Sequence, residues 1–493
     1  MEISSVLLSN KAIRVISEVT SREKATVYVV GGYVRDMVMK RKTKDIDILV
    51  IGSGIEIAEK VAAEIKGATL NVFKSFGTAQ VKFELPSDTE PDKMLTYELE
   101  FVGARKESYN RGSRKPIVEN GNLEDDLNRR DFTINTLVAS LMLENFGEII
   151  DRFEGILDIE YKILRTPLDP DITFSDDPLR MMRAIRFASQ LGFTIEAKTL
   201  EAISRNASRL EIVSTERITD EFNKILLSET PSVGLWLMEK TGLMNYYMPE
   251  LLHLKGSEYV DGKGHKDNFS HTLQVVDKIR TTTDNIWLIW TALLHDIGKP
   301  ATRMFQKGTG WTFHGHEIVG SKMASPLFKR LRLPLGEPLK YLRKLISLHL
   351  RPAALTEEII TDSAVRRLLF EAGDDINDLM LLAEADITSK NKEKVTRYLT
   401  NFAILREKLQ EVEENDRIRN WQPPVSGEEI MQVFSIPPCK TVGDLKNAVR
   451  EAILNGEIKN DPAEAWKFII RLAGESGLSP KENLPPFNKI ETQ

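Results

Sequence analysis

The sequence lacks the features of a secreted or membrane protein. Its 493 residues include one cysteine, Cys439, so an internal disulfide framework is excluded. No stretch approaches the ~20 apolar residues that cross a bilayer, and the N-terminus has neither the basic start nor the apolar run of an export signal. We therefore expect a cytoplasmic protein without membrane contact. The 41% hydrophobic content supplies ample core, and the length predicts roughly three or four domains.

An overall basic charge is also missing. The formal net charge is -6 and the sequence pI is about 5.9, so any binding of nucleic acid would depend on local basic faces. One candidate is the helical series Arg180, Arg183 and Arg186. The other is the segment from Arg105 to Arg130, which contains glycines and a proline and predicts a basic loop. Its further cations are Lys106, Arg111, Arg114, Lys115 and Arg129. Such a loop suits phosphate groups, and the alternative is a solvated loop that touches no substrate.

Two adjacent glycines stand between a predicted strand and a predicted helix. The β-branched run 25–30 predicts a buried strand, and a helix is expected to begin near Tyr33. Gly31 and Gly32 have no side chains, so the backbone N–H groups of this turn can approach a phosphate closely. Arg35 would then neutralise the charge of a triphosphate. The segment predicts a phosphate-binding turn.

Carboxylates on two further predicted strands form a candidate metal site. Asp45 and Asp47 leave one face of a strand, while the intervening isoleucines point into the core. A later strand, 96–102, places Glu98 and Glu100 on one face, so one of them could be a third carboxylate. Magnesium binds one or two protein carboxylates together with substrate phosphates. Beside the glycine turn, this pattern predicts nucleotidyl transfer; the alternative is a plain turn and a solvated strand end.

These segments resemble the nucleotidyltransferase superfamily that includes DNA polymerase beta and the poly(A) polymerases. Two more segments resemble the tRNA nucleotidyltransferases that build the CCA terminus. They are residues 129–135 (Arg-Arg-Asp-Phe-Thr-Ile-Asn) and residues 176–187 (Asp-Asp-Pro-Leu-Arg-Met-Met-Arg-Ala-Ile-Arg-Phe). The resemblance implies that Glu100 completes the metal site. It also implies nucleotide contacts by Asp131, Asn135, Asp177, Arg180 and Arg183. RNA contacts are implied for Arg105, Arg129 and Arg130.

The chemistry of base selection can be argued from Asp177 and Arg180 themselves. An aspartate only accepts hydrogen bonds and an arginine only donates them. Cytosine and adenine both carry an exocyclic amino donor, whereas guanine and uracil place a carbonyl there. If both side chains lie on one side of a helix, three residues apart, one pair would accept C and A and reject G and U. The alternative is an ordinary salt bridge on a solvated helix face.

Histidines are few, and six of the seven fall between His265 and His349. His295 and Asp296 end an apolar run, and a mixed set of nitrogen and oxygen ligands suits a divalent metal. The order of these residues resembles the HD phosphohydrolase superfamily. That resemblance implies one metal held by His271, His295, Asp296 and Asp386, and a possible second site completed by His316 and His349. Such a site could promote phosphoester cleavage, whereas a single buried histidine is more often a core residue.

The predicted fold class is α+β. A DNA polymerase beta-like nucleotidyltransferase head, 1–150, is followed by a helical neck with the base-selecting helix, 151–255. An HD metal-binding domain, 256–395, and a helical C-terminal tail, 396–493, complete the chain.

The resemblance implies a function in tRNA processing. The expected reaction is addition of C, C and then A to the 3′ end of tRNA from CTP and ATP, with Mg²⁺ and release of pyrophosphate. A further divalent metal is expected in the HD site. Alternatives are a poly(A) polymerase, an enzyme that adds only CC or only A, and a metal phosphohydrolase acting on RNA or cyclic phosphates. An RNA-binding protein with an inactive head is the non-enzymatic alternative.

Overall fold

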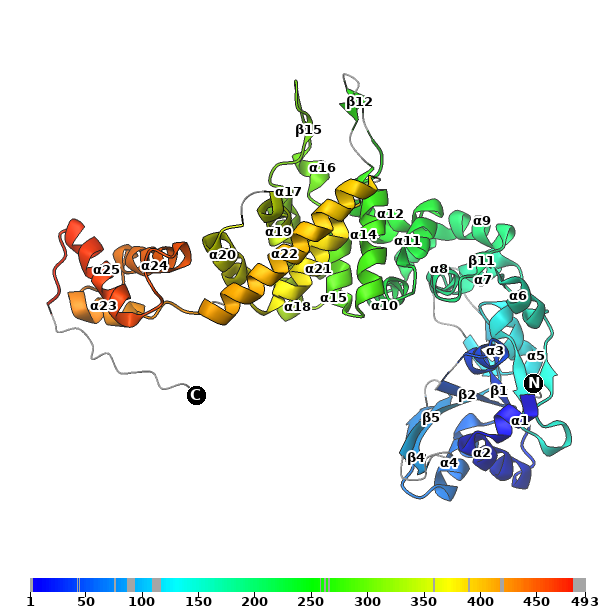
Figure 1. Ribbon diagram of the computed structural model, residues 1–493. Coiled ribbons are helices and arrows are strands. Elements are labelled where there is room, and N and C mark those ends of the chain that lie inside the picture. The colour runs from blue at the N-terminus through cyan, green and yellow to red at the C-terminus, as the bar shows by residue number, and fades with distance from the viewer. Residues whose placement is uncertain are drawn as a thin grey trace. The chain divides into compact units, whose positions relative to one another are not determined.

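Figure 1 shows a computed structural model of the chain. The residues that it describes are 3–41, 43, 45–74, 77–86, 94–108, 117–257, 259–260, 263–264, 267–357, 360–388, 391–416 and 421–481. The chain forms two compact units, Met1–Leu252 and His253–Gln493.

A seven-stranded mixed sheet in the order β3-β4-β5-β2-β1-β8-β9 forms the base of the first unit. Its strands are β1 (Val27–Val30), β2 (Asp45–Val50), β3 (Thr69–Phe73), β4 (Thr78–Pro86), β5 (Met94–Gly103), β8 (Val138–Ser140) and β9 (Ile149–Ile150). Strands β2 and β5 pair in parallel, and the other pairs described in this sheet are antiparallel. The strands expected near residues 25, 45, 78 and 97 are confirmed.

Alternation along the strands gives the sheet two different faces. Val29 and Ile48 pack in the larger core, beneath helices α1 (Ile3–Leu8), α2 (Lys11–Arg22) and α4 (Gly54–Glu64). Leu49 packs in a smaller cluster on the opposite face. Asp45 and Asp47 share the direction of Leu49, because side chains two residues apart on a strand point the same way. The alternation predicted for this strand is therefore confirmed, and its carboxylates lie on the face with the smaller core.

The segment between Arg105 and Arg130 differs from the loop that the sequence predicts. Its described parts are a two-stranded sheet, β6 (Arg105–Ser108) and β7 (Ile117–Asn120), and helix α5 (Leu123–Asn128). A reciprocal capping box starts α5, because Asn122 accepts from the Asp125 N–H and Asp125 accepts from the Asn122 N–H. The predicted basic side chains of residues 111, 114 and 115, and His265 further on, lie outside the described residues.

Helices dominate the rest of the first unit. Helix α3 (Gly32–Val38) connects β1 to β2. The helices that follow the sheet are α6 (Gly155–Tyr161), α7 (Pro170–Asp176), α8 (Leu179–Leu191), α9 (Ala197–Asn206), α10 (Thr215–Leu226), α11 (Pro231–Lys240), α12 (Leu243–Tyr247) and α13 (Pro249–Leu252). Short 3₁₀ turns are η2 (Thr133–Asn135), η3 (Leu143–Asn145) and η4 (Ala207–Ile212). Helix α8 ends at Gly192 with a left-handed φ of 67°, as its predicted C-terminal glycine requires.

The second unit is also mainly helical. Its helices are α14 (Asn268–Thr282), α15 (Ile286–Leu294), α16 (Lys299–Thr302), α17 (His316–Arg330), α18 (Glu337–Leu348), α19 (Leu350–Glu357), α20 (Asp362–Ala372), α21 (Ile376–Asp386), α22 (Lys392–Asp416), α23 (Gly427–Phe434), α24 (Lys440–Asn455) and α25 (Pro462–Glu475), with the 3₁₀ turn η5 (Gly373–Asp375). The last three helices enclose a separate core around Trp466.

Short strands also occur in the parts of the chain after residue 150, where the sequence predicts a helical neck and an HD domain. The neck contains the two-residue parallel pair β10 (Ile163–Leu164) and β11 (Thr194–Ile195). The second unit contains the antiparallel pairs β12 (Tyr259–Val260) with β13 (Lys263–Gly264), and β14 (Met304–Gln306) with β15 (Gly310–Thr312). Two- and three-residue strands are too short for a periodic signal, so the α+β class is unaffected. Among the described residues, no helix is long and apolar enough to cross a membrane.

Candidate functional site

Strand pairing brings the predicted carboxylates of the head together. In the parallel register of β2 and β5, Asp47 lies opposite Glu100 and Asp45 opposite Glu98. The Glu98 carboxylate accepts a hydrogen bond from Lys82 Nζ at 2.6 Å, so it is turned to β4. Glu100 is therefore the better third carboxylate, in line with the prediction from resemblance.

The electrostatics of Asp47 reflect a cluster of acidic side chains. The pKa of Asp47 is raised to about 6, chiefly by burial and also by the neighbouring Glu100 and Asp45 carboxylates, whereas Arg130 opposes the shift. Three acidic side chains that repel one another favour a bound divalent cation, because its charge replaces the protons that the cluster otherwise takes up. The donor set, all carboxylate oxygen, suits Mg²⁺.

Gly31 borders this cluster and leaves no room for a side chain. Its φ is +69°, which L side chains rarely adopt, and an added Cβ would lie 3.0 Å from Arg130 Nη1 and 3.8 Å from an Asp47 carboxylate oxygen. The glycine turn, the acidic cluster and a guanidinium thus meet at one point. Because the φ and the near contacts both exclude a side chain, the predicted use of Gly31 for close approach of the backbone has a geometric basis.

Arg35 does not lie as the sequence suggests. Its side chain is buried, its Nε donates to an Asp36 carboxylate oxygen at 2.8 Å, and its Nη1 donates to Asn135 Oδ1 at 2.8 Å. A guanidinium with these partners is a structural element of the site rather than a free cation for a triphosphate. The cation nearest Gly31 and Asp47 is instead Arg130, which was predicted as an RNA contact.

Four residues predicted to bind the nucleotide form one hydrogen-bonded chain. Arg35 donates to Asn135, Asn135 Nδ2 donates to Asp131 Oδ1 at 2.9 Å, and Arg183 Nε donates to Asp131 Oδ2 at 2.7 Å. We call this series the 35–135–131–183 chain. Burial alone would raise the pKa of Asp131, but Arg183 and Asn135 overcome it and lower the pKa to about 2. Asp131 is therefore a fixed anion whose two oxygens set the positions of its neighbours.

Asp126 orders the two adjacent arginines of the predicted motif. It is fully buried and lies within α5. One of its oxygens accepts from Arg129 Nε at 2.9 Å, and the other accepts from Arg130 Nη2 at 2.9 Å and Nε at 3.1 Å. Because both guanidiniums bond to this one carboxylate, contacts of Arg129 and Arg130 with RNA stay predictions. Arg105 lies in β6, and its RNA contact also stays a prediction.

Asp177 and Arg180 do not share a helix side, which corrects the prediction. Asp177 is an extended residue between α7 and α8, and its carboxylate accepts from the Leu179 N–H at 3.2 Å. Its nearest described cation is Arg217 of α10, at 3.7 Å. Arg180 lies in the first turn of α8 and donates to the Arg129 carbonyl at 2.5 Å. Helix α8 begins at Leu179, two residues after Asp177, because Pro178 is disfavoured inside a helix and stands at its N-terminal boundary.

The two residues nevertheless border the same cavity. It has a volume of about 420 Å³ and is open to solvent. The lining residues are Arg129, Arg130, Asp131, Asp177, Leu179, Arg180, Arg183, Arg217, Asp220, Glu221 and Lys224. Arg130, which lines this cavity, also lies next to Gly31 of the glycine turn. A polar, charged cavity of this size in that place is a candidate nucleotide pocket.

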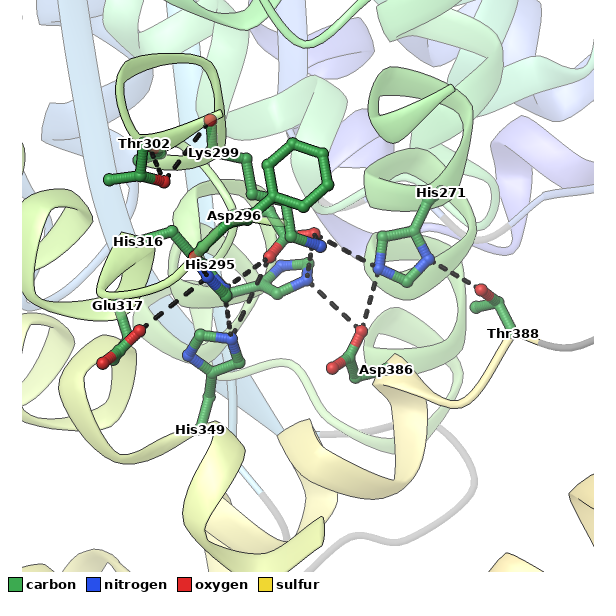
Figure 2. Close-up of polar contacts among 12 residues, drawn as sticks. His271, His295, Asp296, Lys299, Thr302, His316, Glu317, His349, Asp386 and Thr388 are labelled. Atoms are coloured by element: carbon green, nitrogen blue, oxygen red, sulfur yellow. Dashed lines mark hydrogen bonds and ion pairs between the residues drawn. The ribbon is translucent and has the colours of Figure 1, made fainter. Parts of the chain in front are cut away.

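In the second unit, three of the predicted histidines are oriented by the same kind of hydrogen bond. The Nδ1 atoms of His295, His316 and His349 lie 2.7–2.8 Å from the carbonyls of Ala292, Phe313 and Ile346, each three residues earlier. A ring whose Nδ1–H donates to a carbonyl leaves Nε2 as the metal-binding atom. His271 differs, since its Nδ1 lies 2.7 Å from Thr388 Oγ1. Figure 2 shows the four rings converging.

The candidate metal ligands form two groups, His271–His295–Asp386 and Asp296–His316–His349. Asp296 belongs to the second group and also contacts the first. One of its oxygens lies 3.5 Å from His271 Nε2 and 3.3 Å from His295 Nε2, and the other lies 3.3 Å from His316 Nε2. Lys299 Nζ also contacts the first oxygen, at 2.5 Å (Figure 2). All six predicted ligands therefore meet. They divide differently from the prediction, because Asp296 serves both groups.

Burial and charge in this cluster oppose each other. Burial alone would lower the pKa of His295, but the Asp296 and Asp386 carboxylates overcome it and raise the pKa to about 10. Burial lowers the pKa of His349 to about 4, with His295 adding to the effect. His295 Nε2 is buried and has no hydrogen-bond partner. A buried acceptor of this kind, facing carboxylates, fits a divalent metal ion.

Comparison with known proteins agrees with this geometry. Residues 27–165 match the family described as poly A polymerase head domain, 192–254 the probable RNA and SrmB-binding site of polymerase A, and 268–391 the HD domain. An A-adding tRNA nucleotidyltransferase of Deinococcus radiodurans is 31% identical over 72% of this chain and 80% of its own. A CCA-adding enzyme of Bacillus velezensis is 30% identical over 88% of this chain and 91% of its own. The crystal structure of the Bacillus stearothermophilus CCA-adding enzyme in complex with CTP is 24% identical over 95% of this chain and 98% of that one, with a TM-score of 0.63.

The sheet, the glycine turn and the paired aspartates thus define a nucleotidyltransferase head of the poly(A) polymerase type. With its neck and HD domain, the chain belongs to the class II tRNA nucleotidyltransferase family.

Some residues of these sites escaped the sequence analysis. Asp126 precedes Arg129 and Arg130 by three and four residues, a helical pairing signal that was available. Lys299 follows Asp296 by three residues, and this local pairing signal was also available. Arg217 carried no pattern that pointed to Asp177, because their contact depends on the packing of α10 against the start of α8.

Proposed function

We propose that this chain adds C, C and A to the 3′ end of tRNA, using CTP and ATP. The observation that carries the proposal is the acidic cluster of Asp45, Asp47 and Glu100 beside Gly31, with the charged cavity of α8 adjoining it. In the reaction the terminal 3′ oxygen bonds to the α-phosphorus, and the bond from that phosphorus to the pyrophosphate oxygen breaks.

Each part of the site has a role in that reaction. Asp45, Asp47 and Glu100 would hold Mg²⁺, which activates the attacking hydroxyl and neutralises the leaving pyrophosphate. The Gly31 and Gly32 backbone lies where phosphate oxygens approach, and Arg130 supplies positive charge there. Arg35 contributes indirectly, because its guanidinium donates a hydrogen bond to Asn135 Oδ1 and so fixes that side chain.

Base choice is assigned to the cavity that Asp177 and Arg180 border. Asp177 accepts from the amino group that C and A share, and Arg180 donates to a ring nitrogen. The Asp177 carboxylate is held from two sides, because one oxygen accepts from the Leu179 N–H at the start of α8 and the other faces Arg217 of α10. The same two side chains serve both bases.

The test is incorporation on tRNAs that end before, within and after CCA, with Mg²⁺ and each nucleoside triphosphate supplied separately. Ordered addition of C, C and A that then stops supports the proposal. Addition of A alone, of C alone or of unlimited A would replace it with an A-adding, CC-adding or poly(A) enzyme. Binding of RNA without incorporation would indicate an inactive head.

A matched pair of variants tests the metal site. Asp45→Ala and Glu100→Gln are expected to lose most incorporation, by about a hundredfold or more. Glu98→Gln is the control, since Glu98 lies on the same strand and face but pairs with Lys82. Equal losses in the two glutamate variants would contradict the assignment of Glu100.

A second activity, metal-dependent phosphoester hydrolysis at the HD cluster, is favoured by the convergence of His295 Nε2 with the Asp296 and Asp386 carboxylates. A divalent metal held there would polarise a phosphate and activate water. Lys299, beside Asp296, is placed to neutralise a substrate phosphate. Cyclic and monoester phosphates are the candidate substrates.

The HD activity can be separated from the head by mutation. Hydrolysis that persists in Asp45→Ala and disappears in Asp296→Asn supports it. His314→Ala is the control, because His314 is exposed and belongs to neither ligand group. Hydrolysis that survives Asp296→Asn would arise elsewhere.

A further inference from the structure

Phe187 of α8 lies among three guanidinium groups. Its side chain is 6% exposed. The guanidinium carbons of Arg186, Arg35 and Arg183 lie 4.2, 5.1 and 5.3 Å from its ring centroid. The edge-to-face contact with Phe132, at 5.9 Å and 85°, fixes the ring from another side. Cations within about 6 Å of an aromatic face are attracted by the ring quadrupole, most strongly where water is excluded.

Two of these arginines are the ends of the 35–135–131–183 chain. Arg35 donates to Asn135 at one end, and Arg183 donates to Asp131 at the other. The ring therefore closes the chain into a loop, with hydrogen bonds along one side and ring contacts along the other. The Arg35 and Arg183 guanidiniums thus face the ring while their N–H groups donate to the Asn135 amide and the Asp131 carboxylate.

Electrostatics show why a ring is suited to this position. The pKa of Arg186 is lowered to about 10, chiefly by burial and also by the positive charges of Arg183 and Arg35, while the Glu221 and Asp131 carboxylates oppose the shift. Like charges thus act on one another within the cluster. An aliphatic side chain would give no attraction to offset this repulsion, and a carboxylate would compete with Asp131 for Arg183.

We infer that Phe187 is a positioning residue, which holds the 35–135–131–183 chain in the form that binds a nucleoside triphosphate. This inference rests on the proposed nucleotidyl transfer. The ring acts through Arg35 and Arg183, so its effect is on nucleotide binding rather than on the chemical step.

The test replaces Phe187 by phenylalanines with one, two and three ring fluorines in the full-length chain. Fluorination keeps the shape and apolarity nearly constant and withdraws charge from the ring face. The KM for CTP and for ATP is expected to rise stepwise, by about tenfold at three fluorines, while kcat changes less than about threefold. Phe174 of α7, which is fully buried, carries the same series as control.

Two results would overturn the inference. One is a KM that stays constant across the Phe187 series. The other is an equal rise in the Phe174 series together with equal loss of thermal stability, because both rings would then act through packing alone.

A spectroscopic readout separates this inference from the proposed function. With ¹⁵N-labelled arginine, the Nε–H groups of Arg183 and Arg35 are expected to exchange faster with solvent as fluorines are added to Phe187. If the wild-type chain incorporates no nucleotide but this exchange still follows fluorination, the proposed function fails and the positioning role stands. Exchange rates that do not respond would remove the positioning role, whatever the activity.

Discussion

Asp131 illustrates how one buried carboxylate orders a site at the residue scale. Its two oxygens bond to Arg183 and Asn135, and its pKa is lowered to about 2. The sequence identified Asp131, Asn135 and Arg183 as nucleotide-binding because they lie in segments that resemble a family. It did not reveal that they bond to one another, because the pairs are separated by up to 52 residues.

The pH dependence of Asp131 follows from the sign of its shift. A carboxyl whose pKa falls on folding stabilises the native state above its unfolded value, and that stability is lost as the pH falls from about 4 to about 2. Asp131→Asn should therefore reduce the free energy of unfolding by about 2 kcal/mol at pH 7 and by much less at pH 2–3. Urea denaturation at both pH values measures this. Equal destabilisation at both pH values would show that the shape of the Asp131 side chain, not its charge, is responsible.

The control is Asp171→Asn, which removes the charge of a solvent-accessible aspartate paired with Arg205. It is expected to change the free energy of unfolding by less than about 0.5 kcal/mol.

Gly31→Ala tests whether the close approach of Gly31 to Arg130 and Asp47 matters for nucleotide binding. The substitution adds a Cβ 3.0 Å from Arg130 Nη1 at a φ of +69°. We expect a loss of about 1 kcal/mol in stability and a rise in the KM for CTP and ATP of about tenfold or more. Gly192→Ala is the matched control, since its φ is +67° with nothing within 4 Å of the added Cβ. Gly192→Ala should lower the stability by a similar amount and leave the KM for CTP and ATP unchanged. An equal rise in KM in Gly192→Ala would show that the rise in Gly31→Ala comes from lost stability alone.

At the scale of the element, α5 connects the fold to the site. Leu127 packs into the small core of the sheet while Asp126 holds Arg129 and Arg130. Local features predicted the strands of the sheet, because alternation and β-branching are contained within a few residues. They did not reveal that Asp177 faces Arg217 or that Arg35 bonds to Asn135, because these contacts join residues distant in sequence.

Asp126→Asn should disturb both arginines at once. Breaking a buried ion pair leaves uncompensated charge, so we expect a loss of about 3 kcal/mol in stability and a rise in nucleotide KM. Thermal unfolding and steady-state kinetics measure the two effects. Glu124→Gln on the same helix removes an exposed pair with Arg152 and should cost less than about 0.5 kcal/mol. A variant of Asp126 as stable and active as the parent would contradict its assigned role.

At the scale of the molecule, the first unit contains the carboxylates and the charged cavity, and the second contains the HD cluster. The order of these parts was predictable, since each motif is confined to one stretch of sequence. The division of ligands around Asp296 was not, because it depends on how five helices meet.

Metal binding at the HD cluster should protect the helices of the second unit that carry its ligands. Mn²⁺ at a hundred times its Kd would stabilise the metal-bound state by about 2.7 kcal/mol and slow hydrogen exchange about a hundredfold. The protected peptides should come from α14, α15, α17, α18 and α21. Mass spectrometry of exchange measures this, with Asp296→Asn expected to abolish the protection and His314→Ala to retain it. Protection unaffected by Asp296→Asn would place the metal at another site.

The parallel pairing of β2 and β5 has a consequence for the order in which the protein is made. Asp47 and Glu100 are neighbours in the sheet but 53 positions apart in the chain, and α4, β3 and β4 are synthesised between them. A ribosome that has released β2 has not yet released the partner of its carboxylates. The antiparallel β3–β4–β5 meander supplies more local contacts and is expected to form earlier, whereas the parallel pair must close a long loop. The acidic cluster is thus expected to assemble after the β3–β4–β5 meander, when the parallel pair closes.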